Sequence, residues 1–190
     1  MNNLIKVNQI SACLITRDAT YPHQVLESVA QYPFGEILIL TNCDSPFKKY
    51  ELINKAKFDM IYYQDDDAIC PINELLDKSK PDELNIAMKY GHFDLYKDRR
   101  LTMGMGWGSI FNRKILKTLK KYTDKYGEDD VFKREAERIL TYLNYPQNRV
   151  ILPIIDTAAA NDLNRLWRQS HHHKYVRIVE ERCSKLKEIL

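Results

Sequence analysis

The sequence predicts an α/β fold, in which a mostly parallel central sheet is flanked by helices. Short apolar segments that favour strands alternate with segments of helical periodicity through the first half of the chain. Two strand–helix units lead into a third strand, and such units form parallel sheets through right-handed crossovers. The polar ends of these strands are therefore expected to meet along one edge of the sheet, where ligands bind in folds of this class.

The elements of the first half can be assigned in chain order. Strands are predicted over residues 10–16, 36–40 and 60–63, and helices over residues 22–31 and 50–56. Each predicted strand is a short apolar run that ends at polar residues. This pattern is typical of buried strands.

The second half of the chain is less regular. Strands or extended segments are predicted over residues 84–90, 103–111 and 150–155. Helices are predicted over residues 112–125, over residues 129–143, and from residue 175 to the end. In the first of these helices, lysines line the face opposite the apolar residues, and we interpret this as a solvated face. Since the sequence shows no repeat and no linker, we expect residues 1–190 to form one domain.

Charge, hydropathy and cysteine spacing exclude several classes of protein. The 190 residues carry 29 Lys and Arg against 26 Asp and Glu, and the net charge of +3 is too small to indicate a nucleic-acid partner. No apolar run approaches the roughly 20 residues of a membrane span, and the N-terminus lacks the apolar core of a signal peptide. The spacing of Cys13, Cys43, Cys70 and Cys183 favours buried thiols over a zinc site. We therefore expect a soluble, cytoplasmic protein.

Three adjacent aspartates, Asp65, Asp66 and Asp67, follow the third predicted strand. Adjacent carboxylates repel one another unless a cation or water relieves the repulsion. Hard divalent cations such as Mg²⁺ and Mn²⁺ prefer carboxylate oxygens and bridge readily to phosphate oxygens. In an extended segment Asp65 and Asp67 can face the same space while Asp66 points away. At the end of a buried strand this pattern favours a metal–phosphate site over a solvated acidic turn.

Two further polar clusters each leave two interpretations open. Residues 128–130, with the sequence Glu-Asp-Asp, precede a predicted helix, and acidic residues there are favoured by the helix dipole. Helix capping therefore competes with a catalytic role. Residues 171–173 are three histidines, which form either a polar loop or the source of one metal ligand.

The polar motifs follow one another in a defined order. They read TRD at 16–18, TNCD at 41–44, DDD at 65–67, GWGS at 106–109 and GED at 127–129, followed by a late histidine. This order resembles the metal-dependent nucleotide-sugar glycosyltransferases of the GT-A fold. The similarity is greatest to the small inverting, family-2-like enzymes, including some encoded by large DNA viruses. It covers roughly residues 8–175.

The resemblance implies a GT-A-like single domain. A Rossmann-like, nucleotide-sugar-binding half would span about residues 8–100, a smaller acceptor half about residues 101–175, and a closing helix residues 176–190. The activity implied is transfer of a sugar from a UDP- or dTDP-sugar to a carbohydrate or glycoconjugate hydroxyl, with inversion and with Mn²⁺ or Mg²⁺ as cofactor. The Gln-x-x-Arg-Trp motif of processive synthases is absent. A monomer or weak dimer is expected.

The resemblance also implies a role for individual residues. Those expected to bind the nucleotide sugar are Thr16, Arg17, Asp44, Asp65, Asp66, Trp107 and Gly108. Those expected to hold the metal are Asp67 directly, Asp65 through the hydration shell, and either His171 or His173. Those expected to act in catalysis are Asp129, or the adjacent Asp130, as the general base, with Glu128 beside them.

Other functions are compatible with parts of the sequence. A sugar-phosphate nucleotidyltransferase would carry a glycine-rich loop after the first strand, where this chain has no glycine over residues 16–20. A non-enzymatic module that binds RNA or another anion would use the lysines of residues 114–121, but it leaves the three aspartates unexplained. A catalytically inactive sugar-nucleotide binder has the same sequence features as the enzyme.

Overall fold

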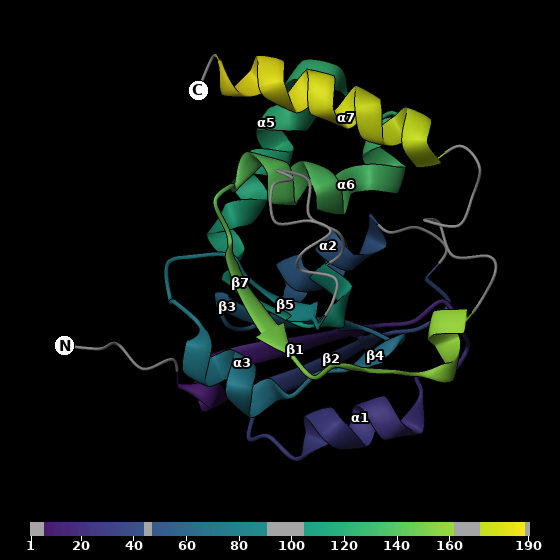
Figure 1. The fold of residues 1–190 in the computed structure, drawn as a ribbon, viewed down its shortest axis with the longest axis vertical. Coiled ribbons are helices and arrows are strands. Elements are labelled where there is room, and N and C mark those ends of the chain that lie inside the picture. The colour runs from purple at the N-terminus through teal and green to yellow at the C-terminus, as the bar shows by residue number, and fades with distance from the viewer. Residues whose placement is uncertain (1–5, 44–46, 91–104, 162–171, 189–190) are drawn as a thin grey trace.

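The computed structural model describes residues 6–43, 47–90, 105–161 and 172–188, and within them six strands form one central sheet (Figure 1). The strands lie in the order β2 (Glu36–Leu40), β1 (Ile10–Ile15), β3 (Met60–Asp65), β6 (Ser109–Asn112), β5 (Asn85–Lys89) and β7 (Asn148–Leu152). β1 pairs in parallel with both β2 and β3, and β5 pairs in parallel with β7. β6 runs antiparallel to its neighbours β3 and β5. The predicted α/β fold with a mostly parallel sheet is confirmed.

Helices cover both faces of the sheet (Figure 1). α1 (His23–Ala30) and α3 (Ile72–Lys78) pack on one face. α2 (Lys48–Lys55), α5 (Lys117–Tyr126), α6 (Asp130–Leu143) and α7 (His172–Lys187) share the core of the other face, where α7 packs on α6. The sheet is therefore buried between two helical layers.

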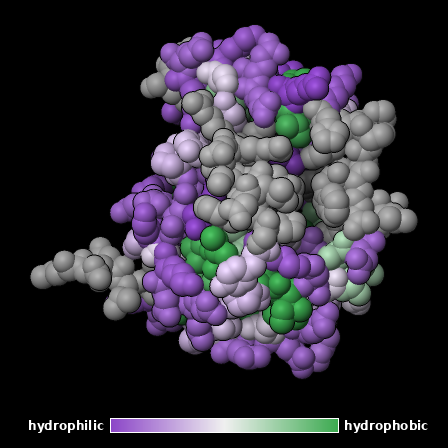
Figure 2. Space-filling model, in the orientation of Figure 1, coloured by the Kyte–Doolittle hydropathy of each residue, from purple (hydrophilic) through white to green (hydrophobic). Residues whose placement is uncertain are grey.

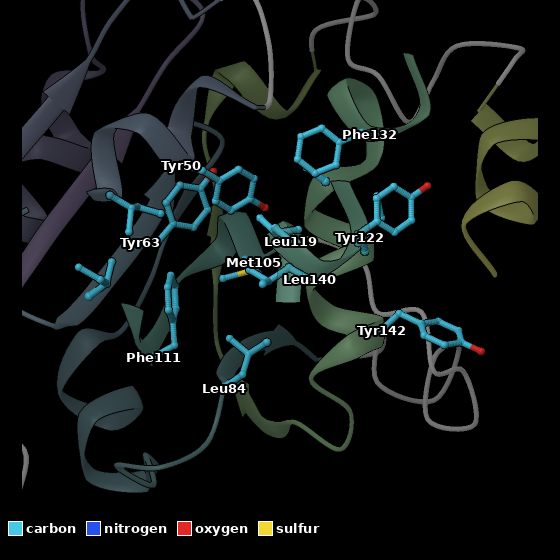
Figure 3. Packing of buried hydrophobic residues seen from close by; sticks show 14 of the residues in the cluster. Tyr50, Tyr63, Leu84, Met105, Phe111, Leu119, Tyr122, Phe132, Leu140 and Tyr142 are labelled. Carbon is cyan, nitrogen blue, oxygen red and sulfur yellow. The ribbon is translucent and has the colours of Figure 1, made fainter. Parts of the chain in front are cut away.

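The alternation of side chains along β1 supplies both cores. Every residue of β1 is buried, as parallel strands covered on both faces require. Cys13 and Ile15 join the core beneath α2 and α6, whereas Ala12 and Leu14 join the core beneath α1. Aromatic side chains fill much of the α2–α6 core, as Figure 3 shows. All four cysteines are buried thiols, as expected.

Several predicted elements have different boundaries in the structure. The segment 103–111 was expected to be extended, but Met105–Trp107 is a 3-10 turn (η2), which precedes β6. The helix predicted from residue 112 begins as a 3-10 turn (η3, Arg113–Leu116), where the Asn112 side chain accepts a hydrogen bond from the N–H of Lys114. The strand predicted over 150–155 is divided into β7 and β8 (Ile155–Asp156), and Pro153 between them has no N–H for a ladder.

Two elements beside the three aspartates were not predicted. β4 (Ala68–Ile69) follows them directly and pairs antiparallel with β8. α3 follows β4 in the chain. Strands of two residues carry too little periodicity to be recognised in a sequence, and their pairing joins segments almost ninety residues apart.

The face of the molecule that Figure 2 shows is mainly hydrophilic, with a few apolar residues scattered over it. Among the described residues, none of the helices is both long and apolar enough to cross a membrane.

Candidate functional site

The three aspartates lie where β3 ends and turns into β4. Thr157, which follows β8, fixes the backbone of this turn. Its hydroxyl donates to the carbonyl of Asp66 at 2.7 Å, and its N–H donates to the carbonyl of Asp67 at 2.9 Å. The short β4–β8 ladder therefore holds the acidic turn in one conformation.

The end of β1 is joined to the same turn. Ile15 pairs with Asp65, so β1 and β3 end at the same edge of the sheet. The hydroxyl of Thr16 donates to Oδ2 of Asp66 at 2.5 Å and accepts a hydrogen bond from the N–H of Asp18 at 3.1 Å. Both Thr16 and Asp66 are buried, whereas Arg17 is exposed. The structure thus brings Thr16 and Asp66 together and turns their side chains toward each other.

Asp65 is held on the opposite side of the strand from Asp66. The hydroxyl of Tyr63 donates to its Oδ1, and the hydroxyl of Tyr21 donates to its backbone carbonyl at 3.0 Å. Burial raises the pKa of Asp65 to about 7, and the charges of Glu137 and Asp67 add to this effect, whereas Lys49 and the Tyr63 hydrogen bond oppose it. The carboxylates of Asp65 and Asp67 are therefore close enough to interact.

The glycine-rich segment packs against the same strand end. A Cβ atom at Gly106 would lie 2.1 Å from Oδ2 of Asp65, so the carboxylate occupies the space that a side chain would need. At Gly108, where φ is +122°, a Cβ atom would lie 2.6 Å from Sγ of Cys70. Trp107 between them is half-buried and packs against the α1–α3 core. The predicted sugar-binding segment and the acidic turn are thus adjacent.

A buried ion pair lies behind Asp65, and sequence reasoning missed it. Lys49 on α2 is only 4% exposed, pairs with Glu137 on α6, and donates to the Tyr63 hydroxyl at 3.1 Å. Although burial lowers the pKa of Lys49, the carboxylates of Glu137 and Asp65 raise it above its ordinary value, so the side chain is a cation. Lys49 lies four residues before the apolar Ile53 in α2, so the two share a helix face, and this spacing could have indicated that Lys49 is buried.

The acidic cluster at 128–130 caps a helix. Asp129 is the N-cap of α6 and accepts a hydrogen bond from the N–H of Phe132 at 3.0 Å. Its Oδ2 pairs with Nη1 of Arg182 on α7 at 2.7 Å. Although burial raises the pKa of Asp129, the Phe132 N–H and the Arg182 guanidinium hold it below its ordinary value. Glu128 and Asp130 are exposed. The capping interpretation is confirmed, and the catalytic role stays a prediction.

Several predicted residues lie outside the described part of the chain. Asp44 and His171 fall in segments that the structure does not describe. His173 falls within α7, but its side chain is not described. Among the described residues, no group of three or more His, Cys, Asp or Glu side chains could hold a metal ion.

The donors present fit a hard divalent cation that keeps water or phosphate ligands. Asp65 and Asp67 carry carboxylate oxygens at the carboxyl ends of the paired strands β1 and β3, and both residues are half-buried. Mg²⁺ is commonly bound by one or two carboxylates together with substrate phosphates. Two aspartates are therefore sufficient for the protein's share of such a site.

Comparisons with known proteins give structural similarity alone. No family model and no curated protein matches this sequence. The chain is similar to glucosyl-3-phosphoglycerate synthase from Mycobacterium tuberculosis in complex with Mg²⁺ and UDP, with 13% identity and a TM-score of 0.48 over 93% of this chain and 79% of that chain. The complex of that enzyme with Mn²⁺, UDP and phosphoglyceric acid gives 14% identity and a TM-score of 0.49 over 92% and 78% of the two chains. These values are too low to assign an activity to this chain.

Proposed function

We propose that this protein is a metal-dependent glycosyltransferase that moves a sugar from a UDP- or dTDP-sugar to a carbohydrate or glycoconjugate hydroxyl, with inversion. The observation that carries the proposal is the acidic turn at Asp65–Asp67. It lies at the carboxyl edge of the parallel strands, is fixed by Thr157, and lies against the Gly106–Gly108 segment. Carboxylates placed at this edge favour a cation-bridged diphosphate, because they would repel a diphosphate on their own.

The described residues divide the work of binding. Asp67 would bind Mn²⁺ or Mg²⁺ directly, and Asp65 would contact the hydration shell or the ribose. Thr16, Arg17 and Asp66 would border the nucleotide, with the Thr16–Asp66 hydrogen bond keeping that border in place. His171 or His173 would complete the metal ligands. When bound, the metal would offset the negative charge that develops on the diphosphate leaving group.

The remaining residues would serve the sugar and the acceptor. Trp107 and Gly108 would form the floor beneath the sugar, while residues 101–175 would form the acceptor half and residues 8–100 the nucleotide half. A base from the cluster at 128–130 would take the proton of the acceptor hydroxyl. A general base works best when its pKa lies near the working pH, so Asp129 would need to leave Arg182 before accepting a proton. The protein would act in the cytoplasm as a monomer or weak dimer.

Thermal denaturation with metals and nucleotides tests this proposal. We expect UDP or dTDP to raise Tm only when Mn²⁺ or Mg²⁺ is present. At a ligand concentration about 100 times Kd, the stabilisation is about 2.7 kcal/mol, which corresponds to about 5–11 °C for a chain of this size. Metal alone and nucleotide alone are the controls. No shift with any pair from a panel of nucleotides and both metals would refute the proposal.

The substitution Asp67→Ala makes the test specific to the acidic turn. Removing this carboxylate should abolish the metal-dependent shift, because it takes away the proposed direct ligand. Asp77→Ala on α3 is the matched control, since Asp77 is exposed and lies outside the acidic turn. A variant with Asp67→Ala that still gave the full shift would exclude Asp67 as the metal ligand. Release of UDP from a panel of UDP-sugars would then identify the donor.

A further inference from the structure

Charged side chains are rarely buried, and the Lys49–Glu137 pair lies in the aromatic core behind the acidic turn. The side chain of Lys49 is 5% exposed and that of Glu137 is 17% exposed. Desolvating two charges is costly, and a pair of well-packed apolar residues often serves stability as well or better. The pair therefore calls for an explanation beyond stability, and its connections supply one.

Two hydrogen bonds connect Lys49 to Asp65 through the hydroxyl of Tyr63, and the donor in each is fixed by the chemistry of the groups. A lysine ammonium has donors and no acceptor, so the Tyr63 oxygen must accept from Nζ at 3.1 Å. The single hydroxyl hydrogen of Tyr63 is then free to donate, and it donates to Oδ1 of Asp65. The cation thus orients the hydroxyl, and the hydroxyl orients the carboxylate. Figure 3 shows Tyr63 in this core with Tyr50 beside it.

The same ion pair is also connected to the other carboxylate oxygen of Asp65, through the backbone of Met105 and Gly106. Oε1 of Glu137 accepts a hydrogen bond from the N–H of Met105, while its Oε2 pairs with Lys49. Met105 begins the turn η2, whose next residue, Gly106, packs against Oδ2 of Asp65. Both oxygens of Asp65 are therefore held by groups that are connected through Lys49 and Glu137.

We propose that Tyr63 is a positioning residue, anchored by the Lys49–Glu137 pair, that fixes the carboxylate of Asp65 for the bound cation and diphosphate. The inference rests on the proposed function, because it needs a ligand at the acidic turn. It makes the ion pair part of the binding site without contact between Lys49 and the ligand. The hydrogen bonds from Lys49 through Tyr63 orient the carboxylate of Asp65, and the ion pair keeps that orientation when ligands bind or leave.

Tyr63→Phe tests the inference, and Tyr50→Phe is its matched control. Both substitutions remove one buried hydroxyl from the same core. The hydroxyl of Tyr50 has no hydrogen-bond partner among the described residues, whereas that of Tyr63 holds Asp65. The readout is Mn²⁺ affinity of the full chain, measured by electron paramagnetic resonance with and without UDP. Asp65 is itself proposed as an outer-shell group, and loss of an outer-shell partner lowers metal affinity about 10- to 100-fold. Tyr63 acts through Asp65, so we expect about tenfold weaker binding for Tyr63→Phe, at the low end of that range, and less than a twofold change for Tyr50→Phe.

Gly106→Ala displaces the same carboxylate from its other side. A Cβ atom 2.1 Å from Oδ2 forces Asp65 to move, and Gly106 has no positive φ that would strain an alanine. We expect a similar loss of Mn²⁺ affinity, and this variant decides the matter if Tyr63→Phe does not fold. Wild-type affinity in either folded variant would overturn the inference and leave the proposed function intact. Absence of Mn²⁺ binding by the wild-type protein with UDP would overturn both.

Discussion

Replacing Lys49 by methionine should strongly destabilise the protein. The methionine keeps an unbranched apolar chain in place of the lysine stem but leaves the carboxylate of Glu137 buried without its cation. Breaking a buried pair in this way costs about 3–5 kcal/mol. For a chain of this length, each kcal/mol corresponds to about 2–4 °C, so Tm should fall by about 6–20 °C. Urea denaturation followed by circular dichroism gives the free energy of unfolding directly.

The double variant Lys49→Met/Glu137→Gln separates the lost charge from the lost packing. Glutamine keeps a carbonyl oxygen for the N–H of Met105 but carries no charge that needs a partner. We expect the double variant to recover most of the stability, with an interaction energy of at least about 2 kcal/mol in the double-mutant cycle. Lys120→Met is the surface control, because its pair with Asp124 is largely exposed, and it should cost about 0.5 kcal/mol or less.

Two outcomes would refute this reasoning. The first is a Lys49→Met variant within about 1 kcal/mol of the wild type, which would mean that water or a rearranged side chain replaces the cation. The second is a double variant that is no more stable than the single one, which would assign the loss to packing around the lysine stem rather than to the uncompensated charge.

Two further predictions concern Asp129 and Asp65. Asp129→Ala removes a helix cap and should lower the free energy of unfolding by about 1 kcal/mol, whereas Asp129→Asn retains the cap. In a transfer assay, loss of turnover in the Asp129→Asn variant with donor binding intact would identify Asp129 as the base. Near-full turnover in that variant would exclude it. The raised pKa of Asp65, caused mainly by burial, means that its protonated form favours the folded state, and this stability is lost as the pH rises through about 7. Asp65→Asn should therefore raise Tm relative to wild type in metal-free buffer by more at pH 8 than at pH 5, because the carboxyl is already ionised in the unfolded chain at pH 5 but still mostly protonated in the folded one. An equal effect at both pH values would show that the charge of Asp65 is not responsible.

The position of the acidic turn could be predicted from local sequence patterns, but the contacts of its side chains could not. The apolar run MIYY predicts a buried strand, and the position of Asp65–Asp67 follows because the turn comes directly after it in the chain. Parallel pairing of β1 with β3 then brings Thr16 to the same edge, as the strand–helix order predicts. The pattern did not predict which residue each aspartate side chain contacts. Asp66 is held by Thr16 and Asp65 by Tyr63, which depends on contacts across the sheet and along the strand.

The order of strands and helices up to the acidic turn, the mostly parallel sheet and the edge that carries the aspartates were determined by the sequence on its own. They depend on hydrophobic periodicity and chain direction, which act over a few residues. Only the tertiary structure decided that Lys49 is buried against Glu137, that Arg182 holds Asp129, and that β8 closes over the acidic turn. These pairs join residues between 53 and 88 positions apart. A charged residue has the same local pattern whether it faces solvent or a distant partner, so the choice is made by packing of the whole chain.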